Sequence, residues 1–300
     1  MEKIFVTGGT GFLGRHLLPE LARAGAKEIR VLSRSGKPPA AGALPSCARI
    51  VHGDLLQSSG YTEALQGASC VIHMAAATGK ATREEHFQAS LEATRRLVHA
   101  CYAAGVERML YVSSIAARFP NQTRYWYAQA KRRTELYLSG SRLQFTIVRP
   151  TMIFGNDSPV LAGLARLAAL PVIPVLGDGR TPVQPVAVED AARVVAALAG
   201  QGDFCGETME LGGPEALPIE ELLKKMARRL RAGEPRVIRL PFGLVIPPLT
   251  VLEMLINRAL PVTVGQLAAF RNSGAAERHP SLATHTAKMK SLEEMLAALG

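Results

Sequence analysis

Short apolar runs rich in Val, Ile and Leu alternate with longer segments of helical periodicity through the first half of this 300-residue chain. Such runs predict buried strands, and apolar residues that recur every three or four positions predict the helices that cover them. The expected strands are residues 3–7, 28–33, 49–53, 70–74, 109–113 and 145–149, and the expected helices are 12–24, 62–66, 83–104 and 125–139. This alternation favours a doubly wound α/β fold, in which helices cover both faces of a parallel sheet.

The pattern changes after Pro150, where prolines separate short helices from short strands. Residues 183–188 are expected to form a strand that rejoins the main sheet, and residues 189–199 the helix that follows it. The final helix is expected at residues 291–299. The predicted division is a sheet domain of residues 1–150 with 183–200, and a smaller substrate lobe of residues 151–182 and 201–300.

The composition, with 48% hydrophobic residues, is that of a globular protein. The longest apolar stretch, residues 240–252, is too short to span a bilayer and contains three prolines. Met1 leads directly into the first predicted strand, which leaves no room for a signal peptide. We therefore expect a cytoplasmic protein whose four separated cysteines stay reduced.

The formal net charge of +10 allows two interpretations. Basic residues cluster at 224–231 on a predicted helix, and no zinc-finger, recognition-helix or RNA-binding pattern accompanies them, so we expect no nucleic-acid partner. In one interpretation the basic helix faces water and residues 240–252 pack on the lobe. In the other, the two segments associate weakly with a membrane surface.

A glycine-rich turn joins the first predicted strand to the first predicted helix. Gly8 lets the backbone turn sharply, Gly11 lets a pyrophosphate approach the helix N-terminus, and Gly14 permits close packing of the helix. Unpaired N–H groups and the helix dipole favour a negatively charged ligand at this end. The turn predicts a Rossmann fold that binds a dinucleotide through Gly8, Thr10, Gly11, Phe12, Leu13 and Gly14.

The end of the second strand favours NADP(H) over NAD(H). Dinucleotide folds that prefer NAD usually carry an acidic residue there, which accepts a hydrogen bond from the ribose 2′-hydroxyl. This strand ends in Ser33-Arg34 instead. Arg34 can pair with the 2′-phosphate of NADP(H), and Arg15, just after the glycine turn, can assist it.

Tyr127 and Lys131 lie one turn apart on a predicted helix and therefore share a face. A nearby cation, together with an oxidised nicotinamide ring, lowers the pKa of a phenol, so Tyr127 can exchange a proton with a substrate oxygen near neutral pH. Ser113 and Ser114 end the fifth predicted strand, and strand ends face the cofactor crevice in this fold. A serine hydroxyl there can hold the reacting oxygen beside Tyr127.

Together, the TGxxGxxG turn, the Ser114-to-Tyr127 spacing and the YxxxK motif resemble the short-chain dehydrogenase/reductase superfamily over nearly the whole chain. The resemblance implies that Ser114, rather than Ser113, orients the substrate oxygen. It implies that Tyr127 is the acid/base, and that Lys131 lowers its pKa and anchors the ribose. Further implied cofactor contacts are the adenine ring at Asp54 and Leu55, the nicotinamide ribose at Ala75 and Ala76, and the nicotinamide carboxamide at Pro150 and Ile153.

Residues 149–155 are similar to a segment of the extended and atypical branches of this superfamily, but two positions depart from the pattern. Ala187 replaces the histidine of their HVxD turn. Ser90 stands where many members carry an asparagine, so the resemblance does not extend to a proton relay through that residue. Residues 175–186 and 210–214 look most like a subgroup related to the NADPH-binding accessory subunit of respiratory complex I. Some members of that subgroup bind dinucleotide without known turnover.

Three functions follow from these motifs. The first is an NADP-dependent oxidoreductase, or an epimerase using the dinucleotide transiently, that exchanges a hydride with a carbonyl or carbinol carbon of a small molecule. Ser114, Tyr127 and Lys131 favour it. The second is a catalytically silent NADPH-binding protein with a structural or assembly role, which Ser90 and the subgroup resemblance favour. The third, a nucleotide-sugar epimerase, needs basic residues for a second diphosphate, and the sequence does not identify them.

The histidines outside these motifs lack the paired spacing of metal ligands, so we expect no metal site. Neither the substrate nor the oligomeric state follows from the sequence.

Overall fold

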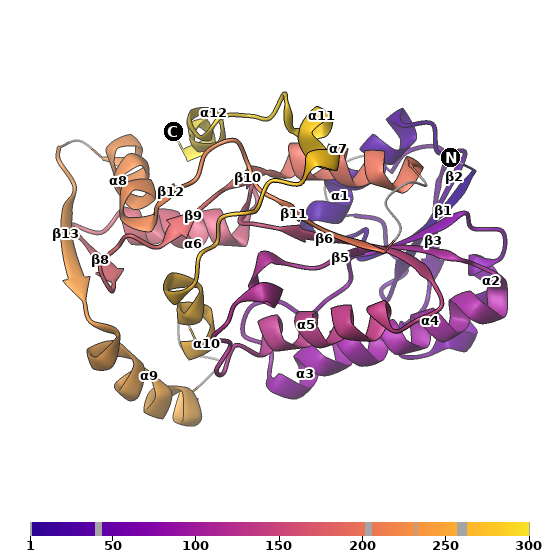
Figure 1. Ribbon diagram of the computed structural model, residues 1–300, viewed down its shortest axis with the longest axis horizontal. Coiled ribbons are helices and arrows are strands. Elements are labelled where there is room, and N and C mark those ends of the chain that lie inside the picture. Colours follow the sequence, from indigo (N-terminus) through magenta and orange to yellow (C-terminus); the bar gives the residue numbers. More distant parts are fainter. Residues whose placement is uncertain (1, 40–43, 202–205, 232, 257–262, 300) are drawn as a thin grey trace.

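The computed structural model describes residues 2–39, 44–201, 206–231, 233–256 and 263–299 (Figure 1). A seven-stranded parallel sheet in the order β11-β6-β5-β4-β1-β2-β3 forms its larger part. The chain moves outward from β1 to β3, then continues from β4 on the other side of β1, which is the doubly wound Rossmann topology that the sequence predicts. The strands are β1 (Lys3–Thr7), β2 (Glu28–Ser33), β3 (Ala48–His52), β4 (Cys70–His73), β5 (Arg108–Val112), β6 (Gln144–Pro150) and β11 (Glu207–Leu211).

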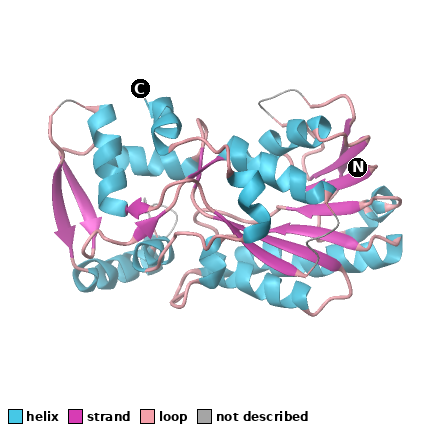
Figure 2. Ribbon diagram, turned by 45° about the horizontal axis from the view of Figure 1, so that its top comes forward, coloured by secondary structure: helices cyan, strands magenta, loops and turns pink. Residues whose placement is uncertain are grey.

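Helices cover both faces of the sheet (Figure 2). Successive residues of a strand point to opposite sides, so Ile4 and Val6 pack on one face and Phe5 on the other. The first face is covered by α1 (Phe12–Arg23) and α7 (Val188–Gly200). The second is covered by α2 (Thr62–Leu65), α4 (Ala93–Ala104) and α5 (Trp126–Ser139). Because both faces are buried, the central strands β1, β4 and β5 are nearly continuous apolar runs.

The predicted helix 83–104 contains a π-helical interruption. It begins as α3 (Arg83–Phe87), continues as a π-helical segment at Gln88–Glu92 and ends as α4. Thr82 and Glu85 form a capping box at its start, and Gly105 ends it in the left-handed conformation. The pattern of apolar positions does not reveal the interruption, because a wider turn shifts the helical register by a single residue.

Residues 183–188 do not rejoin the main sheet, so that expectation is wrong. Instead, β10 (Val186–Ala187) pairs with β7 (Ile153–Phe154), and β9 (Pro182–Val183) pairs with β12 (Leu217–Pro218). Prolines at 182 and 185 lack the N–H groups that a continuous ladder needs. The seventh strand of the main sheet is β11, from the part of the chain expected in the lobe, and the helix α7 packs in the main core together with Val186 of β10.

A second hydrophobic core is built from buried side chains between Phe154 and Leu296. It joins helices α6, α8 and α12 to a short parallel sheet of β8 and β13. The elements of this lobe are α6 (Pro159–Ala168), β8 (Val172–Leu176), α8 (Ile219–Leu230), β13 (Arg236–Leu240), α9 (Phe242–Ile256), α10 (Val264–Leu267) and α12 (Leu292–Leu296). The short helix α11 (Ala283–Thr286) packs on α7 instead.

The two segments that raised the question of membrane contact have different surroundings. The basic residues of α8 are paired with acids, namely Lys224 with Glu220, Arg228 with Glu234, and Lys225 and Arg229 with Glu293. Residues 240–252 form the end of β13 and most of α9, and several of them are exposed. Within the described ranges, no helix is long and apolar enough to cross a bilayer. The thiols of Cys47 and Cys101 are free, the thiol of Cys70 donates to the carbonyl oxygen of Val71 (3.6 Å), and Cys205 lies outside the described residues.

Candidate active site

The glycine turn runs from the end of β1 into the first turn of α1. Gly8 has a φ of +73°, and a Cβ atom there would lie 2.7 Å from the amide nitrogen of Ala75. A Cβ atom on Gly14 would lie 2.3 Å from the carbonyl oxygen of Gly8. Gly11 caps α1 without a side-chain hydrogen bond, and the first turn carries no acidic residue. The first N–H groups of α1 are thus left for an anionic ligand, and a pyrophosphate fits this cradle.

Other predicted cofactor residues gather at the same edge of the sheet, because the carboxyl ends of parallel strands meet there. Asp54 follows β3, and one of its carboxylate oxygens accepts a hydrogen bond from the backbone two residues later (2.9 Å). Ala75 follows β4, and its N–H donates to the hydroxyl of Thr7 (3.4 Å). Leu55 follows Asp54, Ala76 follows Ala75, Pro150 ends β6 and Ile153 begins β7.

Arg34 and Arg15 lie in different settings. Arg34 follows β2 and is exposed, and no acidic side chain in the described ranges pairs with it. The guanidinium of Arg15 forms an ion pair with Asp157 (2.9 Å) and lies over the ring of Phe12, 5.6 Å from its centre. Ser33 is buried beside Arg34. Of the two arginines, Arg34 is therefore the one whose guanidinium is unpaired among the described residues and open to an anionic ligand at the end of β2.

Ser114, Tyr127 and Lys131 converge where β5 ends against α5. The hydroxyl of Ser114 accepts a hydrogen bond from Ala116 N (3.3 Å) and lies close enough to the phenol of Tyr127 to lower its pKa. The ammonium of Lys131 is buried, donates to the carbonyl oxygen of residue 112 (2.8 Å) and lies 5.9 Å from the centre of the Tyr127 ring. The hydroxyl of Ser113 has no hydrogen-bond partner among the described residues. The structure thus brings the three predicted residues together and turns Ser114, not Ser113, toward Tyr127.

Burial acts in opposite directions on the two titratable groups of this trio. It lowers the pKa of Lys131 to about 7, although the carboxylate of Glu135 acts the other way. It raises the pKa of Tyr127, and the nearby side chain of Ser114 only partly offsets this. The expected lowering of this pKa includes the effect of an oxidised nicotinamide ring and stays a prediction, whereas in the protein alone the loss of hydration raises the pKa. Tyr127 is a protonated phenol, able to donate its proton.

A buried chain of hydrogen bonds links the glycine turn to the π-helical segment. The hydroxyl of Thr94 donates to the carbonyl oxygen of Ser90 (2.5 Å) and so accepts from Nε2 of His73 (2.9 Å). Nδ1 of His73 is then unprotonated and accepts from the hydroxyl of Thr7 (2.6 Å). Complete burial, followed by the charge of Lys131, lowers the pKa of His73 to about 3, so the imidazole is neutral.

The side chain of Ser90 takes no part in this chain of hydrogen bonds. Its hydroxyl is buried and has no hydrogen-bond partner among the described residues. The sequence shows that Ser90 replaces the asparagine of many superfamily members, but it does not reveal the structural role of Thr7, His73 and Thr94. Their sequence separations of 66 and 21 residues leave no local signal of the contact.

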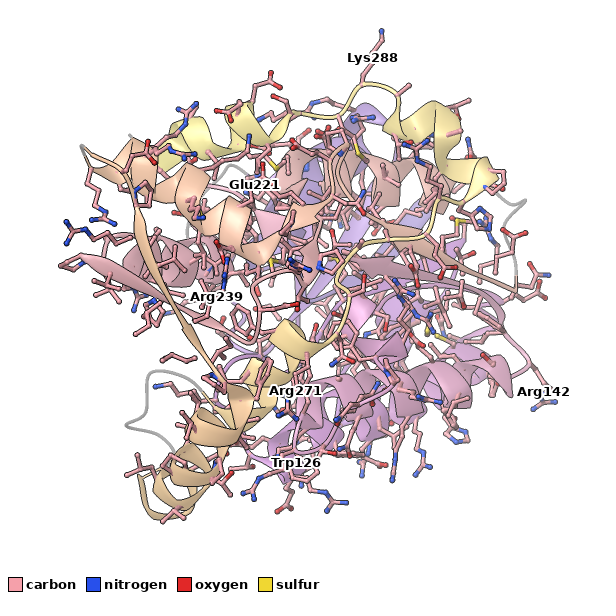
Figure 3. All side chains as sticks on the ribbon, turned by 60° about the vertical axis from the view of Figure 1, so that its left-hand side comes forward. Trp126, Arg142, Glu221, Arg239, Arg271 and Lys288 are labelled. Atoms are coloured by element: carbon pink, nitrogen blue, oxygen red, sulfur yellow. The ribbon has the colours of Figure 1, made fainter. Side chains whose placement is uncertain are left out.

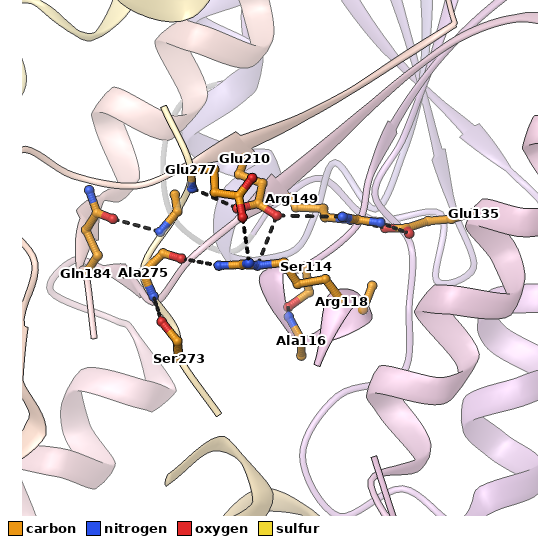
Figure 4. A network of polar contacts seen from close by, with 12 residues as sticks. Ser114, Ala116, Arg118, Glu135, Arg149, Gln184, Glu210, Ser273, Ala275 and Glu277 are labelled. Carbon is orange, nitrogen blue, oxygen red and sulfur yellow. Dashed lines mark hydrogen bonds and ion pairs between the residues drawn. The ribbon is translucent and has the colours of Figure 1, made fainter. Parts of the chain in front are cut away.

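A network of ion pairs holds the other side of α5 (Figure 4). Glu135 of α5 forms a bidentate pair with Arg149 of β6 (2.7 and 3.0 Å). Arg149 also approaches Glu210 of β11 (3.6 Å), which pairs with Arg118 (3.0 Å). Arg118 belongs to the short turn that follows Ser114, so the network ties the serine turn to α5. The only sequence signal is that Glu135 occupies an inward position of α5.

A cavity of about 190 Å³ adjoins Tyr127. The ring of His86 lies edge-on to the Tyr127 ring, with 5.9 Å between their centres, and the lobe contributes Glu253 of α9 and Gly265 of α10 to the lining. A Cβ atom on Gly265 would lie 2.4 Å from the carbonyl oxygen of Arg124, whose φ is 59°. The lobe therefore packs tightly on the residues before α5, and the cavity lies between lobe and sheet domain. No three His, Cys, Asp or Glu side chains of the described ranges are placed to hold a metal ion.

Comparisons with known proteins agree with this geometry. Residues 4–212 match the sequence model of the NAD dependent epimerase/dehydratase family. The chain is 34% identical over 245 residues to a protein named ceramide reductase from Caulobacter vibrioides, covering 79% of this chain and 73% of that protein. It is 28% identical over 261 residues to NADH dehydrogenase (ubiquinone) 1 alpha subcomplex subunit 9, mitochondrial, of Arabidopsis thaliana, covering 84% of this chain and 64% of that protein. Among solved structures, MoeE5 in complex with UDP-glucuronic acid and NAD shares the fold, with a TM-score of 0.72 and 21% identity over 99% of this chain and 97% of that one.

The close contacts of the glycine turn predict opposite effects for two glycine substitutions. Gly14→Ala should lower the free energy of unfolding by about 1–3 kcal/mol and abolish dinucleotide binding, because the new methyl group overlaps the Gly8 carbonyl. Gly163→Ala, at an open position in the middle of α6, should raise the free energy of unfolding by up to about 1 kcal/mol. Urea unfolding and fluorescence titration with NADPH measure both effects. A Gly14→Ala variant that is as stable as the wild type would contradict the close approach of Gly14 to the Gly8 carbonyl.

The buried Lys131 predicts a pH-dependent stability. The unfolded chain binds a proton at this side chain up to about pH 10, whereas the folded protein releases it at a pKa of about 7. The free energy of unfolding should therefore rise with pH between these values, by at most about 1.4 kcal/mol per pH unit. Lys131→Met should lose this rise, whatever constant change in packing it causes. Urea unfolding of both proteins at about pH 7 and about pH 9 gives the two slopes, and equal slopes would contradict the low pKa.

Proposed function

The chain belongs to the NAD dependent epimerase/dehydratase family, and from this membership we propose that it is an NADP(H)-dependent reductase that converts a carbonyl group of a small molecule to a carbinol. The family and the named relatives confirm the superfamily that the motifs predict, and they support NAD(P)-dependent reductase, epimerase or dehydratase chemistry. The observation that carries the finer proposal is the convergence of Ser114 and Tyr127 beside the buried Lys131, whose ammonium lies 5.9 Å from the centre of the Tyr127 ring.

Each of these side chains has a role that its surroundings support. The hydroxyl of Ser114 orients the carbonyl oxygen of the substrate. The phenol of Tyr127 donates its proton to that oxygen as negative charge develops on it, and its raised pKa keeps the proton available. Lys131 holds α5 against β5, and its pKa of about 7 lets it carry a proton near Tyr127 at neutral pH.

The cofactor in this proposal is held by the residues at the carboxyl edge of the sheet. The N–H groups of the glycine turn would bind the pyrophosphate, Arg34 would bind the 2′-phosphate, and Lys131 would contact the nicotinamide ribose. A bound nicotinamide dinucleotide supplies the hydride for the reduction. The proposal therefore favours NADP(H) over NAD(H), as the sequence predicts.

The cavity beside Tyr127 limits the size of the group that can react there. Drug-sized ligands fill pockets of roughly 300–1,000 Å³, whereas this cavity measures about 190 Å³. It has room for a small, carbonyl-bearing end of a substrate. The relative named ceramide reductase favours a reductase over a nucleotide-sugar epimerase.

A dinucleotide-binding protein without turnover is the second candidate. The relative that is a subunit of NADH dehydrogenase favours it, as does the serine at position 90. The two candidates differ in what Tyr127 does, because a silent protein needs no proton donor.

Replacement of Tyr127 by phenylalanine separates the two candidates. Tyr127→Phe should lower the turnover of any ketone accepted by the wild type by at least about 100-fold, while NADPH affinity stays close to unchanged because the ring still packs. Tyr137→Phe, on the same helix but away from the cavity, is the matched control and should keep full turnover. A screen of ketones followed by NADPH oxidation measures the rates. An undiminished rate in Tyr127→Phe would remove this residue from the mechanism.

Replacement of Arg34 tests the cofactor preference. A charge-assisted hydrogen bond to the 2′-phosphate contributes about 1.5–3 kcal/mol, so the wild type should bind NADPH roughly tenfold to a hundredfold more tightly than NADH. Arg34→Ala should lose most of this preference with little change in NADH affinity. Arg49→Ala, an exposed arginine at the opposite end of the neighbouring strand, should keep it. Calorimetric titration measures the affinities of each protein for NADPH and NADH. Equal or tighter binding of NADH by the wild type would overturn the assigned preference for NADP(H).

A further inference from the structure

The outward side of α9 is apolar. Leu244, Val251 and Leu252 are 72%, 58% and 43% exposed, and Pro247 and Pro248 between them are exposed as well. These five positions follow the spacing i, i+3, i+4, i+7 and i+8, so they lie along one side of the helix. The solvent side of a surface helix in a globular protein is normally polar, and this one carries no charged or hydrogen-bonding side chain.

The apolar surface continues onto the short sheet that precedes α9. Strands β8 and β13 pair in parallel, and Ile173 and Val175 of β8 point into the core of the lobe. The alternate positions point outward, and among them Val172 and Ile238 are 44% and 50% exposed. Pro241 alone separates β13 from α9, so the short sheet and the helix are neighbours at this edge of the lobe (Figure 1).

An unpaired arginine lies on this surface. Arg236 is on the outward face of the sheet, is exposed, and has no acidic partner within the described ranges. Arg271 lies over the ring of Phe242, the first residue of α9, at 4.4 Å from the ring centre (Figure 3), and so on another side of the helix. The acidic residue of α9, Glu253, lines the internal cavity. The unpaired charge on the apolar surface is therefore positive, unlike α8, whose basic residues are paired.

We propose that this face, the exposed sides of α9 and of the β8–β13 sheet, docks on the surface of a lipid bilayer that contains anionic lipids. Apolar side chains at the edge of a bilayer gain burial, and arginines beside them pair with lipid phosphates. A second copy of the chain fits less well, because two molecules with a formal net charge of +10 repel each other, whereas an anionic bilayer attracts each of them. The helix lies at the edge of the lobe, where a flat surface can reach it (Figure 2).

Docking through α9 brings the active-site cavity close to the bilayer. Glu253, near the end of the apolar side of α9, lines the same cavity as Tyr127. If the proposed reductase function is combined with this placement, the substrate is an amphiphile. Its carbonyl-bearing end enters the cavity of about 190 Å³ while its apolar remainder stays with the lipid. This step rests on the proposed function, whereas the docking itself does not.

Flotation of the purified full chain with vesicles tests the docking. The wild type should float with vesicles of phosphatidylcholine containing about one third phosphatidylglycerol, and should float less as NaCl is raised from about 0.05 to about 0.5 M. The double variant L244E/V251E should lose at least about tenfold in vesicle partitioning. Leu136→Glu is the matched control, because Leu136 is a 64% exposed leucine on α5, and it should float like the wild type.

A second measurement keeps the test independent of how well the double variant folds. Leu244→Trp should shift its fluorescence to the blue on these vesicles and be quenched by brominated lipid. Absence of flotation and of quenching would overturn the docking, as would flotation that L244E/V251E leaves unchanged. A dimer in light scattering that L244E/V251E dissociates, without vesicle binding, would assign the face to a second copy and also overturn it. Vesicle binding requires no turnover, so this failure is distinguishable from a failure of the reductase proposal.

Discussion

The hydrogen bond from the buried ammonium of Lys131 to the carbonyl oxygen of Val112 is the contact on which the active site depends. It joins α5 to the end of β5 and thereby sets the distance between Tyr127 and Ser114. A buried ammonium is costly unless it is compensated. Here the ring of Tyr111 lies 4.6 Å from it and the carboxylate of Glu135 favours its charged form. These partners leave the pKa of Lys131 at about 7, so its proton is exchangeable at neutral pH.

Two groups of contacts keep this arrangement rigid from opposite sides. The hydrogen bonds through neutral His73 join the end of β1 to the π-helical segment, so the glycine turn and the helix before β5 cannot move independently. The ion pairs of Glu135, Arg149, Glu210 and Arg118 join α5 to β6, to β11 and to the serine turn. Half-buried bidentate pairs of this kind hold planar side chains in one geometry. The phosphate cradle and the proton donor are thus parts of one connected framework.

The sequence predicted the features that depend on local patterns. The central strands of the main sheet are nearly continuous apolar runs. The glycine turn needs residues without a Cβ at Gly8 and Gly14, and Tyr127 and Lys131 share a helical face by spacing alone. Features that depend on distant partners were missed. The strand that pairs with β6 is β11, whereas the sequence favoured residues 183–188 as the strand that rejoins the main sheet. The partners Glu210 and Arg118 are distant in sequence and meet only in the folded chain. The motif also gives the cation near Tyr127 but not the loss of hydration, which raises the pKa of this phenol in the protein alone.

The central claim, that this site reduces a carbonyl group, is tested most directly by following the transferred atom. The protein would be incubated with NADPH deuterated at both C4 positions and with a panel of ketones that includes amphiphilic ones, and the products analysed by mass spectrometry. The account predicts a carbinol that carries deuterium on the former carbonyl carbon, formed in proportion to the NADPH consumed. Bound NADPH that keeps its deuterium throughout, with every ketone offered, would contradict it and assign the protein to the dinucleotide-binding proteins without turnover.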